Sequence, residues 1–137
     1  MDTVFGIITA VLIIILTRLL SGYLSPKLMA SGILVAIGFI YVGFSLKENP
    51  VNLTILEIGV ALIFYFMATF GYTKNGLLIA YGIILHGVWD IVHHQALIIK
   101  TDVPVYWPSF CFTVDIIDGI YFLILFKKKK DINLVTS

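Results

Sequence analysis

Hydrophobic residues fill five long stretches of the chain, and short polar segments separate them. A helix needs about 20 mostly apolar residues to cross the hydrocarbon core of a bilayer, because each residue adds about 1.5 Å. A helix also satisfies its own backbone hydrogen bonds, which lipid cannot do. The pattern therefore predicts an all-α integral membrane bundle of about five transmembrane helices. The predicted crossings are residues 3–20, 27–46, 53–72, 76–99 and 108–126.

The segments between the crossings are short and contain residues that favour turns. Such residues include Gly22, Pro26, Pro50, Asn75 and Pro104. These connections leave no room for an extramembrane domain, so we expect residues 1–126 to form a single bundle. The four consecutive lysines that begin at residue 127 indicate a basic cytoplasmic tail over residues 127–137.

The composition agrees with this class of protein. Hydrophobic residues make up 60% of the chain and charged residues only 12%, whereas about 25% of the residues in a soluble domain are charged. A soluble enzyme, a disordered tail and a nucleic-acid-binding module are therefore excluded. The expected partner is the lipid bilayer, with a homo-oligomer or a membrane partner left open. Because Cys111 is the only cysteine, no intramolecular disulfide is expected.

The nine basic residues predict the orientation, because Lys and Arg near helix ends are retained on the cytoplasmic side. If the C-terminus is cytoplasmic, five crossings place the N-terminus outside. Seven basic residues then lie inside, and only Lys47 and Lys100 lie outside. We expect a multi-pass protein of the bacterial inner membrane in this orientation.

Ionisable residues inside the crossings are the main feature that lipid contact does not explain. Insertion of an Asp at the centre of a membrane helix costs about 2.5–3.5 kcal/mol. A partner charge, a bound cation, protonation or water must offset this cost. The residues are Glu57, Asp90, Asp115 and Asp118 among the acids, and all three histidines, His86, His93 and His94.

Helical spacing predicts that most of these side chains share two faces. At about 100° per residue, His86, Asp90 and His93 lie within an arc of about 60°, with His94 at its edge. Cys111, Asp115 and Asp118 span a similar arc on the next crossing. If the two helices are antiparallel neighbours, we expect Asp90 to lie level with Asp115, His94 with Cys111, and His86 roughly with Asp118.

Imidazole and carboxylate together are the ligands that Zn, Fe or Mn bind. We therefore predict an intramembrane metal site, and we expect His94, Asp90, Asp115 and Asp118 to converge within about 5 Å on one interior point. The predicted ligands are His86, Asp90, His94, Asp115 and Asp118. Additional or supporting ligands are Glu57, His93 and Cys111.

Three other interpretations stay open. The polar residues could form an interhelical hydrogen-bond network, a proton or ion pathway of a small transporter component, or the outward face of an assembly subunit. Enzyme activity is also open. The residues permit a metal-activated water to hydrolyse or modify a lipid-like substrate, with a carboxylate as general base.

Two motifs carry a resemblance to a known family. They run from His86 to His94 as HGxWDxxHH and from Trp107 to Tyr121 as WPxxCxxxDxxxGxY. In these motifs the chain resembles a family of small bacterial multi-pass membrane proteins of unknown function, which implies a membrane bundle but no activity. In residue types alone it is similar to seven-helix membrane hydrolases that include alkaline ceramidases. That likeness implies zinc held by intramembrane His and Asp.

Overall fold

Five helices account for nearly all of the structure, which is a computed structural model that describes residues 1–47, 50–93, 99 and 103–135. The helices are α1 (Asp2–Leu20), α2 (Pro26–Ser45), α3 (Val51–Thr73), α4 (Gly76–His93) and α5 (Trp107–Val135). Each contains a stretch long and apolar enough to cross a membrane. The prediction of an all-α membrane bundle with five crossings is therefore confirmed.

Local sequence signals explain where several helices begin. The Ser25 hydroxyl accepts a hydrogen bond from the Leu28 backbone N–H, and Pro26 occupies the first turn of α2. The Asn75 side chain accepts from the Leu77 N–H at the start of α4. These contacts satisfy backbone donors that the first turn of a helix leaves unpaired.

Two helix ends differ from the predicted boundaries. Among the described residues, α4 ends at His93, and Ile99 is not helical. Apolar residues continue beyond His93, and that continuity led to the longer prediction of residues 76–99. At the other end, α5 continues through the lysine run to Val135 instead of ending at residue 126, because Lys is a good helix former and helices can extend into water.

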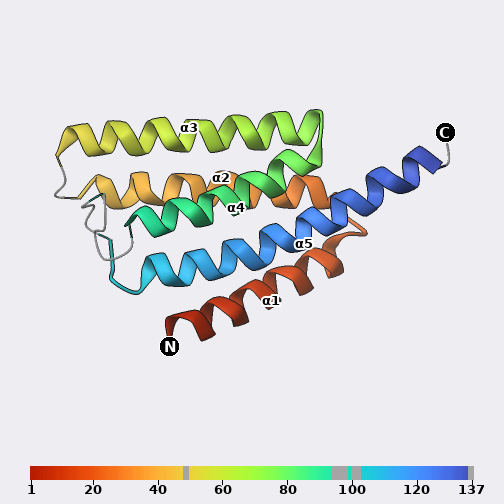
Figure 1. The fold of residues 1–137 in the computed structure, drawn as a ribbon, viewed down its shortest axis with the longest axis horizontal. Coiled ribbons are helices and arrows are strands. Elements are labelled where there is room, and N and C mark those ends of the chain that lie inside the picture. The colour runs from red at the N-terminus through yellow and green to blue at the C-terminus, as the bar shows by residue number, and fades with distance from the viewer. Residues whose placement is uncertain (48–49, 94–98, 100–102, 136–137) are drawn as a thin grey trace.

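The helices form a row in which α5 separates α1 from the rest (Figure 1). α4 packs against α5 on one side and against α2 and α3 on the other, and α2 packs against α3. α1 runs parallel to α5, whereas α4 is antiparallel to it. The two motifs noted in the sequence therefore lie on neighbouring helices.

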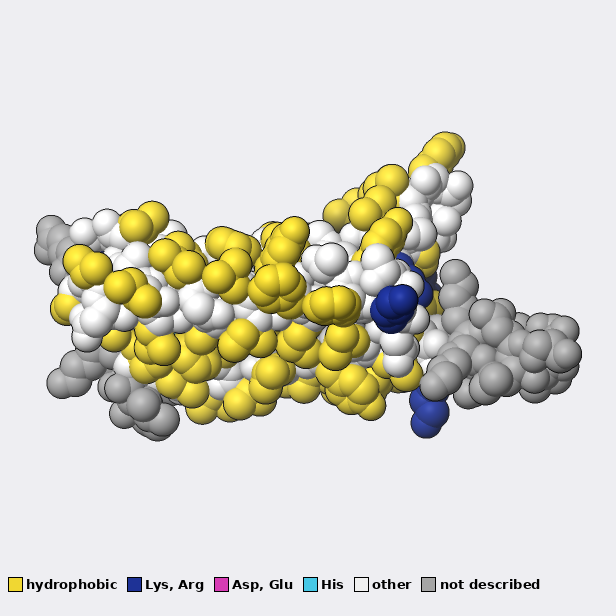
Figure 2. Space-filling view, turned by 90° about the horizontal axis from the view of Figure 1, so that it is seen from above, with side chains coloured by type: hydrophobic (Ala, Val, Ile, Leu, Met, Phe, Trp, Pro, Cys, Tyr) yellow, Lys and Arg dark blue, Asp and Glu magenta, His cyan; other side chains and the backbone are white. Residues whose placement is uncertain are grey.

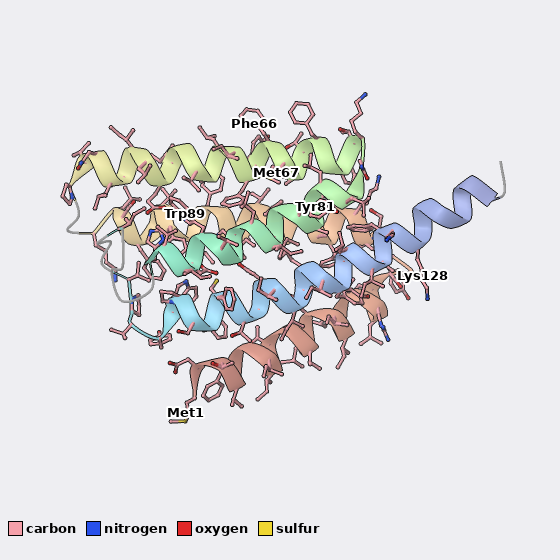
Figure 3. The ribbon with its side chains drawn as sticks, viewed as in Figure 1. Met1, Phe66, Met67, Tyr81, Trp89 and Lys128 are labelled. Atoms are coloured by element: carbon pink, nitrogen blue, oxygen red, sulfur yellow. The ribbon has the colours of Figure 1, made fainter. Side chains whose placement is uncertain are left out.

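The interior changes character along the bundle. Its apolar core includes Leu34, Phe64, Ile83 and Phe122, and it fills the half in which α4 begins. The opposite half, where α4 ends and α5 begins, contains the buried ionisable side chains. Phe66 projects away from the bundle on α3, whereas Trp89 lies in this second half (Figure 3).

The outer surface is suited to lipid. On the face that Figure 2 shows, hydrophobic side chains cover the length of the bundle, and Lys and Arg appear near one end. Large apolar side chains such as Phe5, Ile15, Ile63 and Ile124 are exposed on several helices. The surface thus agrees with a multi-pass membrane protein in contact with a bilayer.

Candidate metal centre

One face of α4 carries the buried polar side chains that helical spacing predicts. His86, Asp90 and His93 are all buried, and they follow the i, i+4, i+7 spacing of one helix face. Since they point into the bundle and not to its surface, they do not form the outward polar face expected of an assembly subunit.

Glycines allow α4 and α5 to approach closely beside these residues. A Cβ atom at Gly119 would lie 2.5 Å from Ile84 Cγ1 and 3.2 Å from the Ile84 backbone nitrogen. A Cβ atom at Gly87 would lie 3.3 Å from Asp115 Cβ. These two contacts set the register between the helices.

The register differs from the predicted one by about one helical turn. His86 Nδ1 lies 2.6 Å from Asp115 Oδ2, so His86 is level with Asp115 and not with Asp118. Asp90, one turn along α4 from His86, still offers a ligand atom within 4.8 Å of that of Asp115. The sequence prediction counted residues from assumed helix ends, and α4 ends earlier than it assumed.

Four side chains converge at this point. His86, Asp90, Cys111 and Asp115 each offer one ligand atom, and these atoms all lie within 4.8 Å of one another. All four residues are buried. Two carboxylate oxygens of the group, Asp90 Oδ2 and Asp115 Oδ1, have no hydrogen-bond partner in the described structure. We call these four residues the α4/α5 group.

Tyr41 of α2 also contacts this group, and it was not among the predicted site residues. Its hydroxyl donates to Asp90 Oδ1 at 2.6 Å, and its ring stacks on His93 with the centroids 4.1 Å apart. The available signal was the helical spacing of small residues around it, Gly38 and Ser45, which mark the buried face of α2.

Glu57 and His93 form a second polar cluster next to the first. His93 Nε2 lies 2.8 Å from Glu57 Oε1, and the Trp89 indole donates to Glu57 Oε2 at 3.3 Å. His93 Nδ1 lies 3.1 Å from the Trp89 carbonyl oxygen, which can only accept, so Nδ1 carries the proton of this bond. Both ring nitrogens of His93 are thus engaged, and Glu57 and His93 stand outside the α4/α5 group.

The remaining predicted ligands have separate positions. Asp118 is buried one turn further along α5, and neither of its carboxylate oxygens has a hydrogen-bond partner in the described part of the chain. It does not belong to the α4/α5 group. His94 lies outside the described residues.

No Lys or Arg compensates the buried acids within the residues that the structure describes. The only ion-pair contacts there join His86 to Asp90 and Asp115, and His93 to Glu57. One imidazole faces two carboxylates in the α4/α5 group. This excess of acidic groups makes it a candidate for binding a cation, since buried charges in membranes are paired or coordinate ions.

Comparison with known proteins gives one match. The model of a family of unknown function (DUF6010) matches residues 1–128, which include every residue of both polar clusters. No curated protein and no solved structure matches the chain.

Proposed function

Because the chain belongs to the DUF6010 family, whose function is not known, we propose a function from the site itself. The protein holds a divalent transition metal ion inside the bilayer, between α4 and α5. The ion serves the hydrolysis or modification of a lipid-like substrate.

One observation carries this proposal: four buried donor atoms from His86, Asp90, Cys111 and Asp115 lie within 4.8 Å of one another. Donor atoms around a tetrahedral ion are about 3.5 Å apart, so the side chains need to close by about 1 Å. A bound ion would also satisfy Asp90 Oδ2 and Asp115 Oδ1, which have no hydrogen-bond partner among the described residues.

The donor set favours zinc, with iron as the next choice. Imidazole and thiolate suit these ions, whereas Mg²⁺ and Ca²⁺ prefer oxygen ligands alone. A divalent ion neutralises the two carboxylates, Asp90 and Asp115. Tyr41, which donates to Asp90, is the kind of supporting partner that orients a ligating carboxylate.

A metal ion at this place supplies Lewis acidity and lowers the pKa of bound water. In the hydrolysis of an ester, the water oxygen bonds to the carbonyl carbon, the ester C–O bond breaks, and a proton leaves with the alcohol product. His86, Asp90 and Asp115 would hold the ion, with Cys111 beside the position left for water. The oxygen of Asp90 or Asp115 that does not bind the ion would take the proton from that water and pass it to the leaving alcohol.

Metal analysis of the detergent-purified protein tests the ligand set directly. We expect about one zinc or iron ion per chain in the wild type and loss of most of it in Asp115→Asn, because a ligand oxygen is removed. Asp118→Asn is the matched control. It changes the same residue type one turn away on α5, also buried but outside the α4/α5 group, and it should retain the metal.

Two outcomes would contradict the proposal. One is a metal-free wild-type protein after growth in medium supplemented with zinc and iron. The other is equal metal loss in Asp115→Asn and Asp118→Asn while both variants elute from size exclusion like the wild type, since the ligands would then not be the four named residues.

A second candidate function, proton-coupled transport, is favoured by the continuity of the polar contacts. Glu57, His93, Tyr41, Asp90, His86 and Asp115 follow one another through three hydrogen bonds, the Tyr41–His93 stack and the 3.8 Å contact between His86 and Asp90. Proton pathways in membranes consist of such Asp, Glu and His chains. This candidate predicts pH-dependent flux in proteoliposomes from metal-free protein. The flux should disappear in Asp90→Asn and persist in Lys74→Gln, which changes an exposed charge at the opposite end of the bundle.

A further inference from the structure

A cavity of about 320 Å³ reaches the α4/α5 group from the side of the bundle. It lies between α1, α4 and α5, at the end where α5 begins. Its volume falls at the lower end of the range for small-molecule sites. Its lining consists of Thr3, Asp90, Ile91, Pro108, Ser109, Phe112 and Thr113. Asp90 therefore belongs to both the cavity and the candidate metal centre.

The arrangement of the helices opens this cavity toward lipid. α1 and α4 both pack on α5 but have little contact with each other, so α5 forms the floor of a groove between them. Two of the lining residues, Thr3 on α1 and Ile91 on α4, are exposed on the outer surface. In a membrane, the molecules that border such an opening are lipid acyl chains.

A close helix contact limits the groove on its inner side. A Cβ atom at Gly6 would lie 2.9 Å from both the Phe110 carbonyl oxygen and Thr113 Cβ, so α1 touches α5 directly there. Thr3 lies about one turn before Gly6 and lines the cavity. A molecule in the cavity is therefore held near this end of the bundle and cannot slide deeper along α5.

The depth of the group matches the polar linkages of a lipid. Tyr106 and Trp107 stand at the start of α5, and such aromatic residues collect at the level of the headgroups. Cys111 follows Trp107 by four residues, which places it about 6 Å further into the membrane. The ester or amide linkages of a bilayer lipid lie just below the headgroups, at this level.

We propose that the cavity binds the first carbons of one acyl chain of a bilayer lipid, the rest of which extends into the surrounding bilayer, and thereby places the ester or amide linkage of that lipid beside Asp90. The substrate then arrives laterally from the membrane and not from water. The claim that the bound lipid is a substrate rests on the proposed function of the metal centre. The claim that the cavity binds a lipid does not, and it is tested without the metal.

Lipid binding is measured by native mass spectrometry of the detergent-purified protein, with palmitoyl-oleoyl phosphatidylethanolamine as the probe. Ile91→Trp fills the cavity from α4, and Val88→Trp is its matched control. The two residues lie on the same helix with exposed fractions of 46% and 48%, but Val88 does not line the cavity. Thr3→Trp fills the cavity from α1, with Val4→Trp as its control.

We expect the wild type, Val88→Trp and Val4→Trp to retain one lipid. Lipid affinity should fall by at least about tenfold in Ile91→Trp and in Thr3→Trp, because a large side chain excludes the acyl chain from a preformed pocket. Equal lipid retention by all five proteins would overturn the inference. So would equal lipid loss in the control variants.

Metal analysis of the same samples separates this inference from the proposed function. If the wild type contains metal and the cavity variants still bind lipid normally, the acyl-chain site is overturned. The proposed metal centre is then still supported. If the wild type contains no metal but binds lipid, and the cavity variants lose that lipid, the metal centre is overturned. The acyl-chain site is then supported.

Discussion

Tyr41 joins two polar clusters that lie on different helices. Its hydroxyl binds Asp90 of the α4/α5 group, while its ring stacks on His93, which pairs with Glu57. A phenol suits this position because it has an apolar ring for packing and one polar end for a hydrogen bond. A substitution that removes the hydroxyl but keeps the ring should therefore alter the orientation of the Asp90 carboxylate and leave the stacking on His93 intact.

Replacement of Tyr41 by Phe tests this role. Loss of the hydroxyl removes the hydrogen bond that Asp90 Oδ1 accepts at 2.6 Å and that orients this carboxylate. Removal of such supporting partners lowers metal affinity by about 10–100-fold, and we expect a decrease at the lower end of that range. Competition with a metal chelator measures the affinity.

Tyr81→Phe is the matched control for this change. Tyr81 lies on α4 but is exposed on the outer surface, so its hydroxyl should be dispensable for metal binding. Equal affinities of Tyr41→Phe and wild type would show that Tyr41 does not support the site.

Sequence reasoning predicted the shared helix faces of α4 and α5 and their meeting at one site, but it missed Tyr41. The spacing of His86, Asp90 and His93 follows from 3.6 residues per turn, which is a local property of the chain. The Tyr41 contact with Asp90 joins residues 49 positions apart. No periodicity within one helix contains that information, because it depends on how α2 and α4 pack.

At the scale of elements, the contact between α4 and α5 determines whether the site can form. No pattern within either helix predicts that Ile84 fills the space beside Gly119. This packing sets the register that brings His86 level with Asp115. The register depends on how the side chains of α4 fit against those of α5. The hydrophobic pattern of either helix alone therefore predicts it poorly.

Gly119→Ala should separate the two helices and weaken the site. The added Cβ would lie 2.5 Å from Ile84 Cγ1 and 3.2 Å from the Ile84 backbone nitrogen, so the helix backbone must shift. Overpacking of this kind costs about 1–3 kcal/mol of unfolding free energy. Unfolding in mixed detergent measures the stability, and metal content should fall in parallel.

Gly59→Ala provides the comparison for this substitution. Apart from the backbone of α3 around it, no described atom lies within 4 Å of a Cβ built at Gly59, and Ala is the better helix former by about 0.5–1 kcal/mol. The control should be as stable as wild type or slightly more stable. Equal stability of Gly119→Ala and Gly59→Ala would contradict the close helix contact.

At the scale of the whole molecule, the two ends of the bundle differ in both charge and interior. Arg18, Lys27, Lys74, Lys127 and Lys128 lie at one end, next to the apolar core. Lys47 lies at the other end, where the polar clusters are buried. If the basic end is cytoplasmic, as the retention of Lys and Arg suggests, the candidate metal centre lies in the outer half of the membrane.

Cysteine labelling in intact bacterial cells tests this orientation. Lys47 and Lys74 are both exposed and lie in connections at opposite ends of the bundle. We expect a membrane-impermeant maleimide to label Lys47→Cys in intact cells and Lys74→Cys only after the cells are broken. Cys111 is buried, so the wild-type protein should remain unlabelled and serves as the background control. The reverse labelling pattern would place the metal centre and the lipid cavity in the cytoplasmic leaflet, where the acyl-chain substrate would have to originate.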